Sequence, residues 1–286
     1  MSNPYLALVE AHNALLQKTD APLFANLDTL GHSPKAALAA DAPVVMIFAP
    51  HPDDECIIGA LPLRLGREAG FRVMNVAVSQ GSSLKRQPER WVEVKNACDY
   101  LGWDLLETIP GGLMDVNCKT RDNNPSAWAE KVAVIRQLIE QYQPQVVVFP
   151  HNNDYHSAHI GTHYLLMDAL KAAQHACTVV QSEFWRQMEA PNALIATSQQ
   201  DTADLIAALA CHVEEVRRNP YHLRLTGWMA DNVRRGAEVC GGQGAAAPTF
   251  SFGTIYHISR FDGQQLLSTD KKFTLSESDE IQAILA

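Results

Sequence analysis

Long apolar runs, closely paired cysteines and an excess of basic charge are all missing from this sequence of 286 residues. No stretch of about 18 uninterrupted apolar residues occurs, which argues against a membrane-spanning helix. The N-terminal residues show no basic region followed by an apolar run that ends in small residues, so no export signal is indicated. We therefore expect a cytoplasmic protein with no membrane span.

The chain also lacks the positive charge with which many nucleic-acid-binding proteins neutralise phosphates. It has 23 basic and 32 acidic residues and a formal net charge of −9. This balance argues against a nucleic-acid partner held mainly by phosphate contacts. It leaves a small-molecule partner open, because a few arginines in a pocket can hold an anion on an acidic protein.

No Cys-x-x-Cys pair is present, and the chain is far too long for a disulfide-stabilised miniprotein. We therefore expect the cysteines to be reduced, mostly buried thiols without a role as metal ligands. The six cysteines are Cys56, Cys98, Cys118, Cys177, Cys211 and Cys240. Hydrophobic residues make up 47% of the chain and charged residues 19%, which is typical of a packed globular protein.

Short Val-rich segments alternate along the chain with segments of helical periodicity. Residues 44–48, 72–78 and 145–149 are apolar runs of strand length, and helical patterns lie between them. Nearly continuous apolar strands that alternate with helices predict a mostly parallel sheet with helices on both faces. The predicted fold class is α/β.

The length fits one α/β domain with elaborations about as well as two small domains, and we expect a single domain, 1–286. Its C-terminal elaboration spans about residues 200–267, and an acidic, peripheral tail follows at 268–286. Residues 219–244 are rich in Arg, Gly and aromatic residues and predict neither a linker nor a plain core element. Further helices are predicted at 89–101, ended by Gly102, and at 128–142, 158–175 and 201–218, and further strands at 105–109, 179–185 and 249–261.

Two polar clusters follow two of the predicted strands. Residues 50–55 read Pro-His-Pro-Asp-Asp-Glu, and residues 150–159 read Pro-His-Asn-Asn-Asp-Tyr-His-Ser-Ala-His. Both fall at the carboxyl ends of predicted parallel strands, where open α/β sheets bind ligands. The two clusters are therefore expected to face one crevice.

Two imidazoles and one carboxylate, with a fourth position left to water, suit a catalytic zinc ion. His51, His159 and an aspartate can supply this set, and the residues alone do not choose between Asp53 and Asp54. The other carboxylate can then take the proton from the attacking water, and His156 can donate to the oxyanion. The alternative is a turn with a helix cap and surface histidines. The occurrence of both clusters at strand ends of one sheet favours the metal site.

For the remaining histidines a structural role is the favoured interpretation. His163 lies one helical turn beyond His159, where it can brace the site or simply pack. The others are His151, His175, His212, His222 and His257.

The two clusters resemble the motifs of the PIG-L/LmbE family of zinc-dependent de-N-acetylases. The family's first motif, Ala-His-Pro-Asp-Asp-Glu, appears here as Pro-His-Pro-Asp-Asp-Glu at 50–55, after Ala49. The second, His-x-x-Asp-x-His-x-Asp-His, matches 151–159 at all but one defining position, where Ala158 replaces the aspartate. The resemblance implies a Rossmann-like fold over roughly residues 40–200. It also implies a zinc-dependent hydrolase that removes an N-acetyl group from an amino-sugar-like substrate.

The resemblance also assigns roles to individual residues. By this resemblance His51, Asp54 and His159 are the zinc ligands and Asp53 is the general base. His156 stabilises the oxyanion and helps the amine to leave.

Two departures from the family pattern concern the surroundings of these residues. Ala158 leaves His156 without its ordinary charge partner, which lowers the pKa of that imidazole, and Asp154 is the candidate to compensate. Residues 80–83, Gln-Gly-Ser-Ser, replace the usual Gly-Glu after the second strand and indicate a different pocket.

Candidate substrate contacts also come from the resemblance. Arg90 matches the arginine of the family's Arg-x-x-Glu, and Asp115 is the closest match by position to an aspartate that contacts sugar hydroxyls. Beyond residue 183 the chain is similar to the de-N-acetylase-like portion found fused to glucosamine-6-phosphate deaminase-like domains. This similarity indicates an amino sugar that carries a phosphate, although a subunit interface or solvated helix faces would also explain the arginines. The candidate anion contacts are Arg218, Arg224, Arg234 and Arg235.

Two other functions stay open at this point. One is a zinc amidohydrolase that acts on a non-sugar N-acyl substrate, and the other is a noncatalytic zinc-binding or sugar-binding protein. Asp53 and His156 are not needed to hold zinc, so their presence weighs against the noncatalytic alternative. The sequence does not name the sugar and leaves open whether the chain forms a homo-oligomer.

Overall fold

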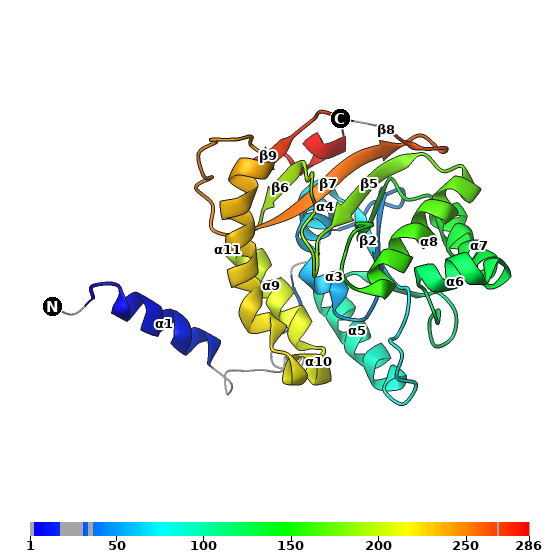
Figure 1. Cartoon of the computed structure of the whole chain (residues 1–286), viewed down its shortest axis with the longest axis horizontal. Helices are drawn as coiled ribbons and strands as arrows, with labels where there is room; N and C mark the ends of the chain where they lie inside the picture. Colours follow the sequence, from blue (N-terminus) through cyan, green and yellow to red (C-terminus); the bar gives the residue numbers. More distant parts are fainter. Residues whose placement is uncertain (1–2, 18–30, 34–36, 268, 286) are drawn as a thin grey trace.

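The computed structural model describes residues 3–17, 31–33, 37–267 and 269–285. In this part of the chain a nine-stranded sheet lies at the centre, with helices on both faces (Figure 1). The strand order is β3-β2-β1-β4-β5-β7-β6-β9, and β8 pairs with β7. Strands β1 to β5 are parallel to one another, whereas β7 runs antiparallel to β5 and β6. The predicted α/β class with a mostly parallel sheet is confirmed.

The strands are β1 (Val44–Ala49), β2 (Arg72–Ala77), β3 (Asp104–Glu107), β4 (Val146–Pro150), β5 (Cys177–Ser182), β6 (Ala193–Ala196), β7 (Gly253–Phe261), β8 (Leu266–Leu267) and β9 (Phe273–Leu275). The helices are α1 (Leu6–Leu16), α3 (Asp54–Ile57), α4 (Ala60–Ala69), α5 (Gln87–Leu101), α6 (Cys118–Asn123), α7 (Pro125–Tyr142), α8 (Ser157–Ala173), α9 (Gln199–Ala210), α10 (Val213–Arg218) and α11 (Tyr221–Val239), with a 3₁₀ helix η1 (Ile281–Leu285). None of these described helices is long and apolar enough to cross a membrane.

The sheet is apolar on both faces because both are covered. On β1, Val45 and Ile47 pack into one core layer with residues of α4, α5, α9 and α11. Met46 and Phe48 point the other way and pack against α7 and α8. This explains why β1 reads as a continuous apolar run rather than an alternating one. Five of the six cysteines are buried and all six are free thiols, as expected.

Helix α11 corrects the prediction for residues 219–244. Its buried side chains include Leu225, Met229, Val233 and Ala237, which recur every fourth residue along one face. Gly236 lies so close to the sheet that a Cβ there would come within 2.7 Å of a methyl carbon of Leu194. The helix is not predicted because the arginines and glycines between these apolar residues make the segment polar on average.

Two further boundaries differ from the prediction. The helix predicted at 201–218 is broken, since α9 ends at Ala210 and α10 begins at Val213. The segment 268–286 is predicted to be peripheral, but β9 pairs with β6 at the sheet edge, and Ile281 and Ile284 of η1 are only 2% exposed. These apolar side chains pack against the main core, so the described residues 269–285 are part of the fold. At the other end, α1 stands apart from the sheet in Figure 1, and none of its residues is buried.

Candidate metal centre and active site

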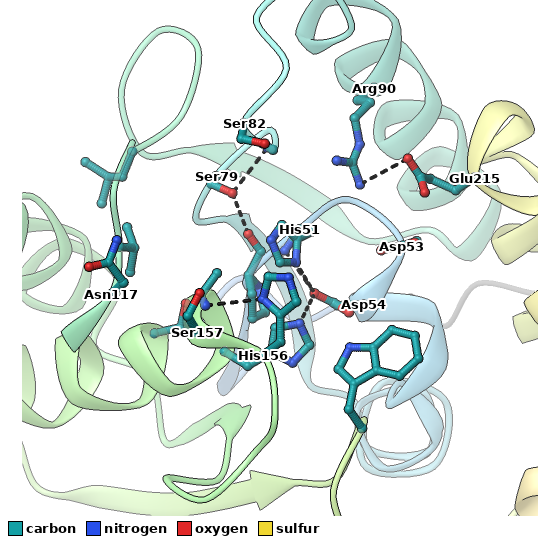
Figure 2. A pocket seen from close by; sticks show the side chains of 18 of the residues that line it. His51, Asp53, Asp54, Ser79, Ser82, Arg90, Asn117, His156, Ser157 and Glu215 are labelled. Atoms are coloured by element: carbon teal, nitrogen blue, oxygen red, sulfur yellow. Dashed lines mark hydrogen bonds and ion pairs between the residues drawn. The ribbon is translucent and has the colours of Figure 1, made fainter. Parts of the chain in front are cut away.

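The two polar clusters lie side by side in the structure. Residues 50–55 follow β1 and begin α3, while 150–159 run from the end of β4 into the first turn of α8. Strands β1 and β4 are parallel neighbours, so their carboxyl ends meet at one edge of the sheet. A pocket of about 500 Å³ opens at this edge (Figure 2). It is lined by His51, Asp53, Asp54, His156 and His159, together with Arg90 and Asp115.

Three predicted ligands converge on one point. Asp54 Oδ2 lies 3.3 Å from His51 Nδ1 and 3.3 Å from His159 Nε2. Ligand atoms that sit about 2.0–2.1 Å from one ion at the tetrahedral angle are about 3.3–3.4 Å apart. The observed separations and the mixed imidazole and carboxylate donors therefore fit a tetrahedral zinc site.

His156 belongs to the same cluster of rings. Its ring centroid lies 4.9 Å from that of His51 and 5.1 Å from that of His159, and the three histidines each offer a ring nitrogen within 4.8 Å of the others. The backbone N–H of Ala158 donates to His156 Nδ1 over 3.2 Å. Only Nε2 is then left to face a substrate or an ion, so His156 can serve as a proton donor or as a fourth ligand.

The electrostatics of the site follow from its burial. Burial acts to raise the pKa of Asp54, but the adjacent His159 and His51 outweigh it and hold that pKa far below its ordinary value. Burial acts to lower the pKa of His159, but Asp54 and Asp154 raise it to about 10. Asp54 and His159 thus stabilise each other's charged forms. When His159 loses its proton, its nitrogen and the Asp54 carboxylate are both free to bind a cation.

Asp154 supports His159 from behind. Its Oδ2 lies 3.8 Å from His159 Nδ1, and its Oδ1 accepts the backbone N–H of His156 over 2.9 Å. The carboxylate therefore approaches the ring of His159 and the backbone of His156. The pKa of His156 is lowered by burial first and by the neighbouring His51 and His159 second.

Asp53 occupies a backbone conformation that side-chain-bearing residues rarely adopt. Its φ is 115°, and it stands just before α3, where its side chain forms no capping hydrogen bond. The peptide unit before it is held at both ends: Arg90 Nη2 donates to the Pro52 carbonyl over 2.9 Å, and the Asp53 N–H donates to Glu55 Oε2 over 2.9 Å. Burial and the adjacent Asp54 raise the pKa of Asp53 well above its ordinary value. Its carboxylate faces the pocket beside Asp54.

A fully buried ion pair lies beneath this turn. His212 Nε2 is 2.7 Å from Glu55 Oε1, and both side chains are 0% exposed. His212 stands in the break between α9 and α10, so the pair connects the first motif to the C-terminal elaboration. The sequence gives His212 a structural role but does not pair it with Glu55, because 157 residues separate the two.

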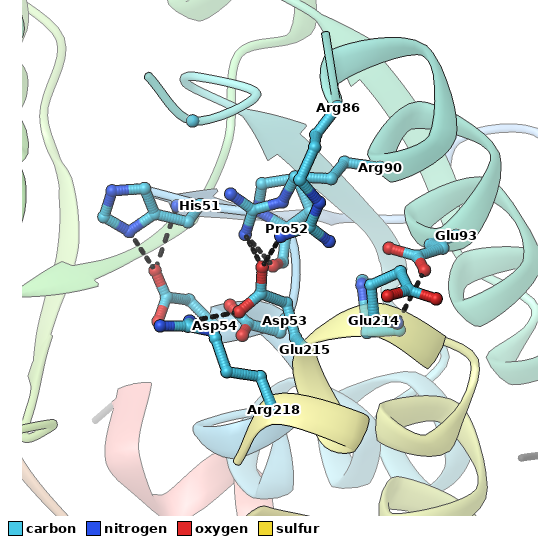
Figure 3. A network of polar contacts seen from close by, with 12 residues as sticks. His51, Pro52, Asp53, Asp54, Arg86, Arg90, Glu93, Glu214, Glu215 and Arg218 are labelled. Carbon is cyan, nitrogen blue, oxygen red and sulfur yellow. Dashed lines mark hydrogen bonds and ion pairs between the residues drawn. The ribbon is translucent and has the colours of Figure 1, made fainter. Parts of the chain in front are cut away.

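A network of arginines forms one wall of the pocket (Figure 3). Glu215 accepts from Arg86 over 2.7 Å, is paired with Arg218, and lies 3.8 Å from Arg90. Arg90, Glu215 and Arg218 line the pocket. Arg90 therefore has two roles open to it, since it lies in the pocket wall and also holds the Pro52 carbonyl.

The other predicted substrate contacts have different positions. Asp115 is exposed and lines the pocket, on the loop after β3. Arg224 lies on α11 and lines a smaller neighbouring cavity instead. Arg234 is paired with Asp231, and Arg235 with Glu183, so both have structural partners.

The loop that departs from the family pattern also reaches the pocket. Ser79, Gly81 and Ser82 line it, and the Ser79 hydroxyl donates to the Pro50 carbonyl over 2.7 Å. The backbone of Gly81 touches the Arg90 guanidinium so closely that a Cβ would lie 2.3 Å from Nη1. Asn117, Trp185 and Tyr221 also line the pocket, and no motif in the sequence predicts them.

Comparison with protein families identifies the segment that carries both clusters. The family described as GlcNAc-PI de-N-acetylase (PIG-L) matches residues 46–170. This segment belongs to the PIG-L family. It contains all of the predicted ligands, the predicted base and His156, and it ends near the C-terminus of α8. A search of the curated proteins found no match. The predicted similarity to portions fused to deaminase-like domains stays a prediction.

Solved structures share the fold of the PIG-L segment and of much of the remaining chain. A zinc-inhibited form of teicoplanin deacetylase Orf2 superposes with a TM-score of 0.56 at 16% identity, covering 77% of this chain and 99% of that one. N,N'-diacetylchitobiose deacetylase from Pyrococcus horikoshii gives 0.54 at 13% identity, covering 92% and 94%. GalB, the 4-carboxy-2-hydroxymuconate hydratase from Pseudomonas putida KT2440, gives 0.56 at 15% identity, covering 82% and 100%. At these identities the likeness concerns the fold alone.

Proposed function

We propose that this protein is a zinc-dependent hydrolase that removes an N-acetyl group from an amino sugar or an amino-sugar-like substrate. The observation that carries the proposal is the convergence of His51, Asp54 and His159 with Asp53 held beside them in the same pocket. The PIG-L match over residues 46–170 supports the same reaction class.

In this proposal His51, Asp54 and His159 hold the zinc ion. When bound, zinc acidifies the attacking water and polarises the acyl carbonyl. Asp154 keeps the ring of His159 in place, as metal-bound histidines generally require.

Asp53 accepts the proton that the water loses as it attacks the carbonyl carbon. Its raised pKa makes it a stronger base than an ordinary carboxylate. His156 donates from Nε2 to the carbonyl oxygen as negative charge develops there. The C–N bond then breaks, the amine takes up the proton, and acetate and a free amino group are the products.

The pocket suits a sugar in size and in polarity. A volume of about 500 Å³ falls in the usual range for small-molecule sites. Among the residues that line the pocket, Asp115, Asn117 and Ser82 offer side-chain oxygens, and Arg90 and Arg218 offer donors. Such a rim can bind hydroxyl groups, and the arginines can also bind a phosphate.

The test is a hydrolysis screen of N-acetylated sugars, N-acetylated sugar phosphates and small N-acetylated amides, with metal content measured on the same sample. Acetate release from the sugars, absent in His159→Ala, supports the proposal. Hydrolysis of the small amides alone would indicate a non-sugar amidohydrolase. Sugar binding without any turnover would indicate the noncatalytic alternative.

A further inference from the structure

A second cavity opens beside the candidate metal centre. Its volume is about 170 Å³, and its lining is largely apolar and aromatic. It shares Asp54, Ile57, Trp185 and Tyr221 with the main pocket. The cavity therefore begins at a proposed zinc ligand, and we call it the side chamber.

Most of the side chamber is built by parts of the chain outside the matched PIG-L segment. Phe184 and Trp185 follow β5, and Phe184 packs edge-on against His159 with ring centroids 4.6 Å apart. The rings of Trp185 and Tyr221 lie 5.9 Å apart at 65°. Helix α11 supplies four side chains at the spacing of one helical face, Tyr221, Arg224, Leu225 and Trp228. The elaboration after residue 170 thus supplies most of the wall of a space next to the reacting atoms.

The side chamber is larger than an acetyl group needs. Acetyl has a single methyl beyond the carbonyl carbon, whereas an apolar protein cavity of about 150 Å³ can bind benzene. Its charged members are Asp54 and Arg224 alone among the described lining residues, so it offers few partners for hydroxyl groups. A second sugar ring buried there would leave hydroxyls without hydrogen bonds, which is unfavourable.

We propose that the side chamber is a subsite for an apolar group of about six carbons, such as a phenyl ring or a short alkyl chain, carried by the N-acyl substrate. This inference rests on the proposed function and adds a substrate class to it. The apolar group can belong either to the acyl chain or to an aglycone on the sugar. Both sources present the same chemistry to Phe184, Trp185, Leu225 and Trp228.

The experiment measures kcat/KM for two series of glucosamine derivatives. The acyl series is N-acetyl, N-butyryl, N-hexanoyl and N-benzoyl, and the aglycone series is the methyl, hexyl and phenyl glycosides of N-acetylglucosamine. We expect kcat/KM to rise in one series by about fourfold for each added methylene until the chamber is full. The series that responds identifies the source of the group. Flat values in both series, or a preference for N,N'-diacetylchitobiose over every apolar derivative, would overturn the inference.

Matched variants connect the preference to the side chamber. Leu225→Phe fills part of it and should reduce the ratio of kcat/KM between the best apolar substrate and its shortest homologue by at least about tenfold. Leu223→Phe makes the same change two residues away on α11, outside both cavities, and should leave the ratio as in the wild type. Trp228→Leu enlarges the chamber and should move the optimum to a longer chain. An equal loss of preference in the Leu223 and Leu225 variants would contradict the assignment.

Binding separates the failure of this inference from the failure of the proposed function. Calorimetry on zinc-loaded Asp53→Asn protein gives dissociation constants for the same derivatives without turnover. If the apolar derivatives bind more tightly and Leu225→Phe abolishes this gain, the side chamber is supported. This holds even if the wild type hydrolyses none of the derivatives, and that lack of hydrolysis would count against the hydrolase proposal alone. Equal dissociation constants along both series would overturn the side chamber even if N-acetylglucosamine is hydrolysed.

Discussion

Asp53 shows how a single residue can be placed by strain. With φ at 115° it has a conformation that costs about 1–3 kcal/mol for a residue with a side chain. The surrounding contacts that maintain this conformation are the Arg90 donor to the Pro52 carbonyl and the Glu55 acceptor for the Asp53 N–H. The strain turns the Asp53 carboxylate toward the pocket while its neighbour Asp54 faces the two histidines. Adjacent aspartates thereby obtain different environments and different proposed roles.

Asp53→Asn tests the division of roles between the two aspartates. Asparagine fills the same space and tolerates positive φ about as well as aspartate does, so the turn should persist and zinc should stay bound. It cannot accept a proton, so turnover should fall by about 10²–10⁴. Zinc content and acetate release, measured on one purified sample, check this expectation. Loss of zinc would make Asp53 a ligand, and near-normal turnover with zinc bound would remove it as the base.

His163 makes the stability depend on pH in a defined direction. Burial lowers its pKa from 6.5 to about 4, and its Nδ1 lies 3.0 Å from the Pro150 carbonyl oxygen. Between these two pH values the unfolded chain binds a proton at this site that the folded protein does not. The free energy of unfolding should therefore fall as pH falls from 6.5 toward 4, by up to about 1.4 kcal/mol per pH unit from this group.

His163→Asn isolates this effect, since its side-chain amide places a donor where Nδ1 lies beside the Pro150 carbonyl but does not titrate. Urea unfolding of both proteins from pH 7.5 to 4.5 gives the difference in stability. The variant should lose stability less steeply than the wild type below about pH 6.5. Parallel curves would show that His163 keeps an ordinary pKa in the folded protein.

At the scale of elements, the sequence predicts best those helices and strands whose own residues carry a clear apolar pattern. The strands β1, β2 and β4 are predictable because sheets covered on both faces need apolar residues at every position. Helix α11 is not, since its apolar stripe is diluted by glycines and arginines that only the packed structure explains. The break between α9 and α10 is also missed, because His212 leaves the helix to meet Glu55.

The same distinction applies to the site. The meeting of His51 and His159 can be predicted because each lies in a compact motif after a strand, whereas the choice of Asp54 over Asp53 comes from the family resemblance. Trp185 lies after β5, whereas Tyr221 and Trp228 lie on α11, so only the folded chain brings these cavity-lining side chains to the motifs. Arg224 is named from the sequence as an anion contact, but it lies by the side chamber rather than the main pocket.

The Glu55–His212 pair joins two elements through buried charge. Burial acts to lower the pKa of His212, but Glu55 raises it, so the pair is expected to be ionised. Removing one member leaves an uncompensated charge in the core, which typically costs about 3–5 kcal/mol. His212→Ala should therefore destabilise the protein by about this amount, as measured by urea unfolding.

A double variant distinguishes the charge from the packing. Glu55→Gln in the His212→Ala background replaces the stranded carboxylate with a neutral amide, which is less costly to bury. The double variant should thus be more stable than His212→Ala alone. The unfolding free energy of Glu55→Gln alone is also measured. If the losses of the two single variants add up to the loss of the double variant within about 0.5 kcal/mol, the side chains do not interact as a charged pair.

At the scale of the molecule, one sheet connects the PIG-L segment to the rest of the chain. The proposed ligands lie after β1 and on α8, which follows β4, and β7, β6 and β9 extend the same sheet on the side of β5. We propose on this basis that the chain is one domain. The first part would supply the chemistry, whereas α11 and the loop after β5 would shape the space around it.

Zinc should stabilise the whole molecule because its proposed ligands come from two distant parts of the chain. His51 and Asp54 follow β1, while His159 lies on α8, so an ion bound between them ties the two segments together in the folded state only. Zinc at about 100 times its dissociation constant adds about 2.7 kcal/mol to the free energy of unfolding. For a chain of this size that amounts to a rise in Tm of about 5 °C.

Thermal melts with a chelator and with added zinc should show this rise in the wild type and in Asp53→Asn, but not in His159→Ala. A wild-type Tm that does not respond to zinc would show that these residues do not hold the ion, and a full response in His159→Ala would mean that other residues bind it.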